Sequence, residues 1–270
     1  MHSSNSSREL SADDPCLKMI PKLEKTSHEE RVAIASHISK GVLKKYKNDV
    51  LAVYVCGSTS KSLDRPFSDL ELIVVVRDNI EIPMKYYLHR GLIIHIQYLN
   101  CSYTLDDAEQ FSDNWHWVAD QYRNRIVLYE RDGWFRRLND AVARSDKRDS
   151  REAIRKSFMM MTESIAVLRN DVLTSDKVGV LMRGRVLAED AARILFLMSR
   201  RYVTTTSWFW KIAFELPNNP KDFKKLVEKM SGFVPTTERE IVASSEKLYK
   251  EMFERIKQYG IKVERNQLWT

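Results

Sequence analysis

Two apolar, β-branched runs that flank a short polar loop constrain the fold of this chain most. The runs are LAVYVCG at 51–57 and DLELIVVV at 69–76. Runs of this composition and length are typical of buried strands. GLIIHIQYL at 91–99 has the same character, and RIVLYE at 125–130 is a shorter candidate. The first half of the chain therefore predicts a β-sheet.

Helical patterns surround this sheet and then replace it. Ser27 and Glu30 have the spacing of a capping box, and apolar residues then recur at helical spacing to about Lys47. A weaker helical pattern covers 104–112. From about Arg131 the strand signals stop, and 3.6-residue periodicity covers the segments 134–143, 150–172, 177–201, 221–230 and 237–259. Short loops between such helices predict antiparallel packing in a bundle.

The predicted fold class is α+β, with a mixed sheet and flanking helices followed by an all-helical bundle. Residues 1–26 are polar and interrupted by Pro15 and Pro21, so we expect a flexible N-terminal arm. We expect the sheet-containing domain at 27–146 and the helical domain at 147–270.

Composition narrows the functional classes. The 270 residues carry a net charge of +7, and residues 147–270 hold 24 Lys and Arg against 16 Asp and Glu. No block of five like charges occurs there, which favours a helical surface with a few functional cations over a nucleic-acid-binding tail. No apolar run reaches the roughly 18 residues that a membrane span needs. Three distant cysteines and a polar N-terminus without a signal sequence predict a cytoplasmic protein.

Asp69 and Glu71 are the strongest candidates for chemistry. Two carboxylates two residues apart on a strand share one face, while Leu70 points to the other. They repel each other unless a divalent cation lies between them, and hard oxygen ligands suit Mg²⁺ bound to substrate phosphates. An isolated Asp-x-Glu is more often a solvated strand face, but the buried runs on either side favour a cleft.

The loop before this pair has features of a phosphate site. Gly57 permits close approach of the backbone, and Ser58 can donate to a phosphate oxygen. Lys61 is near enough in sequence to neutralise a second phosphate. The combination predicts a nucleotide-binding turn.

The order of these features resembles the DNA polymerase β-type nucleotidyltransferase superfamily. Its signature is matched by Gly57-Ser58, a loop of about ten residues, and Asp69-Leu70-Glu71. The chain is more closely similar to the aminoglycoside (kanamycin) nucleotidyltransferases. That similarity includes the helix from Glu30 to Tyr46, the approach Pro66-Phe67-Ser68, and more faintly the helical half to about Val263.

The resemblance implies a set of roles. Asp69 and Glu71 match the metal-binding carboxylates, Ser58 the phosphate-binding serine, and Lys61 a phosphate-contacting basic residue. Glu163 matches the general base that acts on the acceptor hydroxyl. The residues alone leave two other readings of Glu163 open, a solvated helix edge and a partner of Arg169.

The chain also departs from the family pattern. The lysine that contacts nucleotide phosphate falls on Val167, and Arg169, Arg183 and Arg185 are candidate replacements. The third strand, where relatives carry a further acid, has His95 instead. Strand alternation places His95 and Gln97 on one face, either in the core or in the cleft.

The resemblance implies metal-dependent transfer of a nucleoside monophosphate from a nucleoside triphosphate to a hydroxyl acceptor, with release of pyrophosphate. Its partners would be Mg²⁺, the triphosphate and a small hydroxyl compound, in a homodimer. The alternatives are a nucleotide-binding sensor without turnover and an RNA- or protein-directed transferase. No acid lies between Lys85 and Asn100, so we expect poor activity on polycationic aminoglycosides. The acidic residues Asp106, Asp107, Glu109 and Asp113 could instead supply the missing charge.

Overall fold

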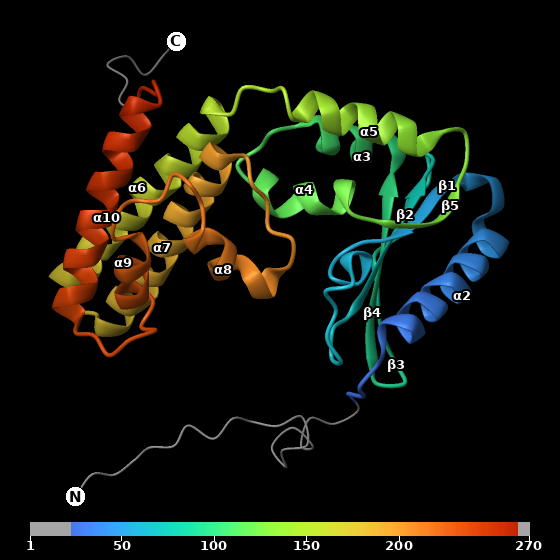
Figure 1. Ribbon diagram of the computed structural model, residues 1–270, viewed down its shortest axis with the longest axis horizontal. Helices are drawn as coiled ribbons and strands as arrows, with labels where there is room; N and C mark the ends of the chain where they lie inside the picture. The colour runs from blue at the N-terminus through green and yellow to red at the C-terminus, as the bar shows by residue number, and fades with distance from the viewer. Residues whose placement is uncertain (1–22, 264–270) are drawn as a thin grey trace, which may run out of the picture. The chain divides into compact units, whose positions relative to one another are not determined.

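The computed structural model describes residues 23–263. They form two compact units (Figure 1). The sheet unit comprises 23–100 and Ile126–Arg131, and the helical unit comprises Cys101–Arg125 and 132–263. Most of the arm predicted at 1–26 lies outside the described residues. The backbone N–H groups of Glu24 and Thr26 donate to the carbonyls of Gly91 and Pro66.

The division into units does not follow the boundary predicted at 146. Three helices, α3 (Cys101–Glu109), α4 (Trp115–Arg123) and α5 (Trp134–Ser145), group with the helical unit. Their contacts explain this, because α3 and α4 pack on α5, and α4 also packs on a helix of the bundle. The division into functional domains at residues 146 and 147 stays a prediction.

The sheet unit contains five strands in the order β3-β4-β2-β1-β5. Their bounds are β1 (Val50–Val55), β2 (Leu70–Val76), β3 (Lys85–His89), β4 (Leu92–Asn100) and β5 (Ile126–Glu130). β2 and β4 are parallel, and the other pairs are antiparallel. The predicted mixed sheet and the α+β class are confirmed, and the four predicted strands are β1, β2, β4 and β5.

Helix α2 (His28–Tyr46) covers one face of this sheet (Figure 1). The predicted capping box starts it, because Ser27 accepts from the Glu30 N–H and the Glu30 side chain accepts from the Ser27 N–H. Alternate residues of β2, Leu70, Leu72, Val74 and Val76, are buried in a core that includes Ala35 and Val42 of α2. The opposite face of β2 therefore presents Glu71.

A two-residue turn sets the register of β3 against β4. Arg90 and Gly91 both have positive φ, 49° and 78°, which is the pattern of a type I′ hairpin. His89 consequently pairs with Leu92, and Tyr86 lies opposite His95. The sequence analysis missed β3 because this edge strand has no buried residue and no alternating pattern.

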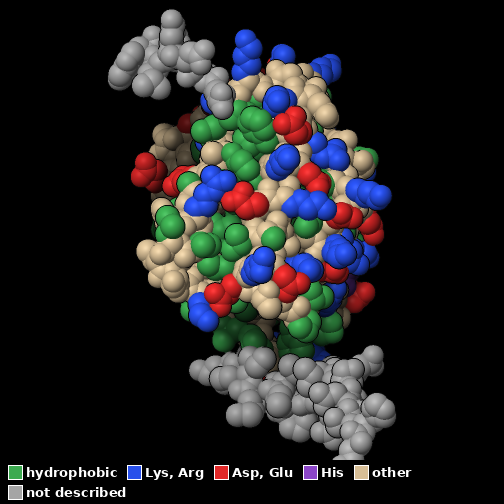
Figure 2. Space-filling view, turned by 90° about the vertical axis from the view of Figure 1, so that its left-hand side faces the viewer, with side chains coloured by type: hydrophobic (Ala, Val, Ile, Leu, Met, Phe, Trp, Pro, Cys, Tyr) green, Lys and Arg blue, Asp and Glu red, His purple; other side chains and the backbone are tan. Residues whose placement is uncertain are grey.

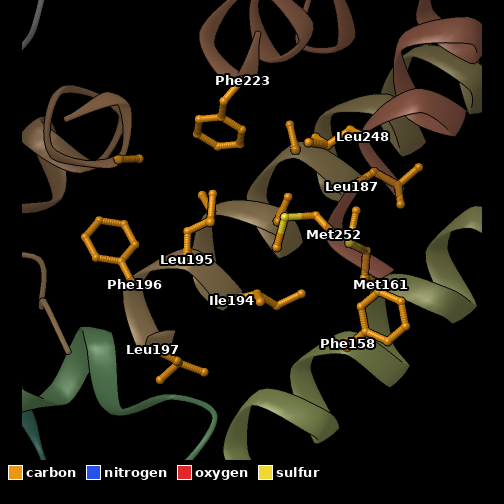
Figure 3. Close-up of a cluster of buried hydrophobic side chains, with 14 of the residues drawn as sticks. Phe158, Met161, Leu187, Ile194, Leu195, Phe196, Leu197, Phe223, Leu248 and Met252 are labelled. Atoms are coloured by element: carbon orange, nitrogen blue, oxygen red, sulfur yellow. The ribbon is translucent and has the colours of Figure 1, made fainter. Parts of the chain in front are cut away.

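The helical unit is built on three long helices, α6 (Arg151–Leu173), α7 (Lys177–Ser199) and α10 (Glu238–Gln258). Two short helices, α8 (Phe209–Phe214) and α9 (Phe223–Met230), lie between α7 and α10 in the chain. Figure 3 shows their shared core, in which Phe158 and Met161 of α6 lie near Met252 of α10. The long predicted helices are thus confirmed, while α4 and α8 were not predicted. None of the helices in 23–263 has the length and apolarity to cross a bilayer.

Candidate functional site

The end of β1 and the start of β2 lie side by side, and this brings the predicted turn against the predicted carboxylates. β1 and β2 are antiparallel, and the N–H of Cys56 donates to the carbonyl of Glu71 over 3.0 Å. Gly57 follows directly. The structure therefore brings Gly57 and Glu71 together, as the phosphate-and-metal hypothesis requires.

Gly57 touches the Glu71 carboxylate. Its φ is +67°, and a Cβ atom built on it would lie 1.9 Å from Oε2 of Glu71. Only glycine leaves room for that carboxylate and adopts this φ without strain. The backbone at Gly57 thus forms one wall of the carboxylate site.

The loop after Gly57 turns back on itself. Residues Thr59–Lys61 form a short 3-10 helix, and the Lys61 ammonium donates to the Gly57 carbonyl. Ser58 is half-buried, and its hydroxyl makes no hydrogen bond with the described part of the chain. A hydroxyl donor and an ammonium group therefore belong to the turn whose Gly57 touches the Glu71 carboxylate, and these groups can bind phosphate oxygens.

Asp69, Glu71 and His95 form one cluster. Glu71 and His95 are partners on the parallel strands β2 and β4, so their side chains share a face. Nδ1 of His95 lies 3.8 Å from Oδ2 of Asp69, and ligand atoms of all three residues lie within 4.8 Å of one another. The side chains of His95 and Asp69 are 26% and 37% exposed. The cluster is accessible and concentrates negative charge.

The donor set fits a divalent cation. Two carboxylates at this distance repel each other, and a bound ion of charge +2 would neutralise both. Carboxylate oxygens suit Mg²⁺ and Mn²⁺, and an imidazole nitrogen suits transition ions. The predicted carboxylate pair and the histidine left open by the sequence thus lie in one place.

A buried arginine positions the loop that leads to Asp69. Arg31 of α2 is 1% exposed. Its guanidinium donates to the carbonyls of Arg65, Pro66 and Ser68 and to the Asp64 carboxylate, at 2.7 to 3.1 Å. Asp64 also contacts Nδ1 of His28 at 2.9 Å. Asp69 follows directly after Ser68, so this network fixes the position of the backbone from which the Asp69 side chain extends.

The sequence analysis missed this network, although a signal was present. Arg31 stands on the same stripe of α2 as the buried residues Ala35, Ser39 and Val42. A charged side chain on the buried stripe of a helix needs a buried partner. Asp64, whose side chain is 2% exposed, is that partner.

Glu163 belongs to the helical unit and stands apart from the ion pairs found there. It is exposed on α6, next to the buried Ser164, and makes no hydrogen bond or ion pair within residues 23–263. Arg169 instead forms a bidentate pair with Glu246, at 2.9 and 3.0 Å. The interpretation of Glu163 as a partner of Arg169 is therefore wrong, and its assignments as a solvated helix edge or as a general base stay predictions.

The three arginines proposed to replace the lysine missing at Val167 differ in their partners. Arg169 is paired with Glu246, and Arg185 pairs with Glu189 at 3.2 Å. Arg183 has no ion pair with a described residue, and its buried Nε has no hydrogen-bond partner among them. Arg183 is thus the most available cation of the three.

Part of the helical unit matches a known domain family. Residues 132–262 match the family model of the KNTase C-terminal domain. Aminoglycoside nucleotidyltransferases (4′) of Staphylococcus aureus and of a Bacillus species are each 25% identical over 129 residues, which are 47% of this chain and 51% of theirs. The predicted resemblance to the kanamycin-type nucleotidyltransferases is confirmed. The chain spans about half the length of the curated relatives it matches.

A solved structure extends the likeness in fold. The nucleotidyltransferase-like protein from Exiguobacterium sibiricum superimposes with a TM-score of 0.56 over 87% of this chain and 82% of its own, at 16% identity. At this identity the match supports the nucleotidyltransferase fold and says nothing of the reaction. The roles of individual site residues are therefore proposals.

Gly57→Ala tests the close approach of the turn to Glu71. We expect the Glu71 side chain to swing away from Asp69 and His95, because the new methyl group would overlap its carboxylate. Mn²⁺ affinity, measured by the EPR signal of the free ion, should fall. The variant should also lose about 1 to 2 kcal/mol of stability, because alanine is strained at this positive φ.

Gly41→Ala is the matched control, since Gly41 lies in α2 with nothing within 4 Å of its added Cβ. Mn²⁺ affinity should stay unchanged in it. Unchanged Mn²⁺ affinity in Gly57→Ala would contradict the geometry of the site.

Arg31→Met tests the loop network. The substitution keeps an unbranched apolar stem but removes the guanidinium from the buried Asp64 carboxylate and from three carbonyls, so we expect the sheet unit to lose about 3 to 5 kcal/mol. Native-state hydrogen exchange of the β1 and β2 amides measures this free energy. Lys40→Met, at an exposed position of the same helix, should change it by less than about 0.5 kcal/mol. Similar protection in the two variants would refute the network.

Proposed function

We propose that this protein transfers a nucleoside monophosphate from a nucleoside triphosphate to a hydroxyl acceptor and releases pyrophosphate. The observation that carries the proposal is the convergence of Asp69 and Glu71 with the Gly57 turn in the sheet unit. The match of residues 132–262 to the KNTase C-terminal domain supports it independently, because it rests on another part of the chain.

Asp69 and Glu71 would hold Mg²⁺ in this reaction. Bound Mg²⁺ would supply neutralisation of phosphate charge and orientation of the α-phosphate for in-line attack. The protein's part is to keep both carboxylates close together, and the Gly57 backbone and the Arg31 network serve this purpose.

The turn would bind the outer phosphates. The Ser58 hydroxyl is available as a hydrogen-bond donor, and the Lys61 ammonium would exchange its contact with the Gly57 carbonyl for one with a phosphate oxygen. Gly57 lets the triphosphate approach the backbone. These contacts would fix the pyrophosphate as a leaving group.

Glu163 would act as the general base. The acceptor oxygen would form a bond to the α-phosphorus as the bond between that phosphorus and the pyrophosphate oxygen breaks. The acceptor proton would pass to the Glu163 carboxylate. The exposure of Glu163 and its lack of an ion pair with described residues support this role, and Arg183 is the candidate for the phosphate contact of the lysine missing at Val167.

The acceptor is proposed to be small and not strongly cationic. On the sheet face around His95, the side chains beyond the Asp69–Glu71 pair are uncharged: Tyr86, Leu88, Ile93 and Gln97. Three of the four acidic residues that could have supplied charge are engaged within the helical unit. Asp107 accepts from Tyr122, Glu109 pairs with Arg144 and Arg148, and Asp113 pairs with Lys156.

A small acceptor is favoured over nucleic acid. Figure 2 shows a face on which Lys and Arg side chains are interspersed with Asp and Glu. Surface ion pairs such as Lys247 with Asp222 neutralise part of the positive charge. A polyanion-binding surface would need a continuous stripe of positive charge.

The proposal also includes a homodimer and a cytoplasmic location.

A screen of hydroxyl acceptors for pyrophosphate release, with Mg²⁺ and each nucleoside triphosphate, tests the function directly. We expect release with a neutral or weakly charged acceptor. Turnover of kanamycin or tobramycin at micromolar KM would overturn the acceptor class but keep the reaction. Tight triphosphate binding without release for any acceptor would select the alternative function, a nucleotide sensor, which the loss of lysine at Val167 permits.

Asp69→Asn should abolish metal-dependent triphosphate turnover and leave the fold intact, because this half-exposed carboxylate adds little to the core. In metal-free buffer we expect its Tm to equal or exceed that of the wild type, since one of two repelling charges is removed. Asp78→Asn, at an exposed position beyond the other end of β2, is the control. Retained turnover in Asp69→Asn would exclude the metal role.

Glu163→Gln should lower turnover by about 10² to 10⁴ with little change in triphosphate affinity, as loss of a general base does. Glu152→Gln, at an exposed position in the first turn of the same helix, should leave turnover unchanged. A parallel loss of binding and turnover in Glu163→Gln would argue against the base.

Mixing Asp69→Asn and Glu163→Gln proteins tests the homodimer. If each site takes residues from two copies, some hybrid sites are intact and activity returns. No recovery after proven subunit exchange would place each site within one chain.

A further inference from the structure

We propose that His95 is a ligand of the bound cation and that its imidazole makes the site bind Mn²⁺ and Co²⁺ more tightly than Mg²⁺. The inference rests on the metal site proposed above and concerns which ion that site selects. It starts from the placement of one nitrogen beside two carboxylates.

The register of the sheet sets this placement. Glu71 and His95 are direct partners on parallel strands, and Asp69 immediately precedes β2. Nδ1 of His95 lies 3.8 Å from Oδ2 of Asp69. That distance is too long for a hydrogen bond, but it fits two ligands of one ion, which lie roughly 3 to 4 Å apart when each bond is about 2.1 Å. A cation can therefore enter with small side-chain movements.

The imidazole ring is supported from its other side. Tyr86, the cross-strand partner of His95 on β3, packs edge-to-face against it with ring centroids 4.3 Å apart. The two-residue hairpin at Arg90 and Gly91 sets this pairing. A ring packed in this way loses little conformational freedom when it binds a metal.

The chemistry of the three ligand residues then decides which divalent ion binds most tightly. Asp69 and Glu71 balance the charge of a divalent ion, and His95 adds a nitrogen donor without further charge. Mg²⁺ prefers an octahedron of oxygen atoms, whereas imidazole binds first-row transition ions well. His95 should therefore raise the affinity for Mn²⁺ and, more strongly, for Co²⁺, while Mg²⁺ binds mainly through the carboxylates.

Direct binding of each metal alone tests the proposal. We would measure the Kd of Mn²⁺, Co²⁺ and Mg²⁺ by calorimetry for the full chain and for His95→Gln and His95→Asp. In His95→Gln we expect the Co²⁺ affinity to fall by about tenfold or more and the Mg²⁺ affinity to change much less. His95→Asp should restore an all-oxygen set and shift the preference toward Mg²⁺.

His89→Gln is the matched control, because His89 is an exposed histidine of the same sheet, on β3. It should keep the metal preference of the wild type. Proton NMR of the Co²⁺-loaded protein gives a second readout, since a ligating imidazole shows a hyperfine-shifted exchangeable N–H signal. That signal should be present in the wild type and His89→Gln and absent in His95→Gln.

An equal loss of affinity for all three ions in His95→Gln, or an unchanged proton NMR spectrum of its Co²⁺-loaded form, would overturn the proposal. Circular dichroism of each variant establishes that it is folded, and His95→Asp provides a test should His95→Gln unfold. The outcome is separable from the proposed function. Metal selectivity that depends on His95 without pyrophosphate release would refute the transferase alone, and transfer with unchanged metal preference in His95→Gln would refute only the role of His95.

Discussion

One guanidinium group supports the site of the sheet unit. Arg31 donates to three carbonyls of one loop, which lies outside any strand or helix, and to a carboxylate that is itself buried. Lysine could not replace it, because an ammonium group has three donors and lacks the planar fork that reaches several acceptors at once. The loop ends at Asp69, so the first carboxylate of the proposed metal site depends on a residue of α2 that lies outside the cluster.

The second carboxylate and the histidine depend on strand order. β4 lies beside β2 and parallel to it because β3 first runs along the outer edge and a tight turn then returns the chain. This arrangement places His95 directly beside Glu71. A shift of one residue in the β3–β4 turn would move His95 to the α2-covered face, so the hairpin positions the nitrogen donor as strictly as Arg31 positions Asp69.

The Arg31 network and the β3–β4 hairpin could not be predicted from the sequence, whereas much of the remaining fold could. Buried strands and long helices have composition and periodicity of their own, so β1, β2, β4 and the long helices of the bundle were predictable. β3 was not, because an edge strand such as Lys85–His89 pairs on one side only and needs no apolar alternation. The pair Gly57 and Glu71 followed from a motif. The Arg31 network and the contact of His95 with Tyr86 depend on tertiary register, which one sequence does not display.

At the proposed metal site, the carboxylate pair would link metal binding to stability. Asp69 and Glu71 are held together by features that remain when no ion is bound: the loop network, the Gly57 backbone and the strand register. Their repulsion is therefore a destabilising contribution in the metal-free protein. An ion bound only to the folded state would remove this repulsion and add its own binding free energy, so stability would rise with metal concentration relative to Kd. The same fixed geometry that makes the carboxylates repel each other would let them bind an ion without rearranging the sheet.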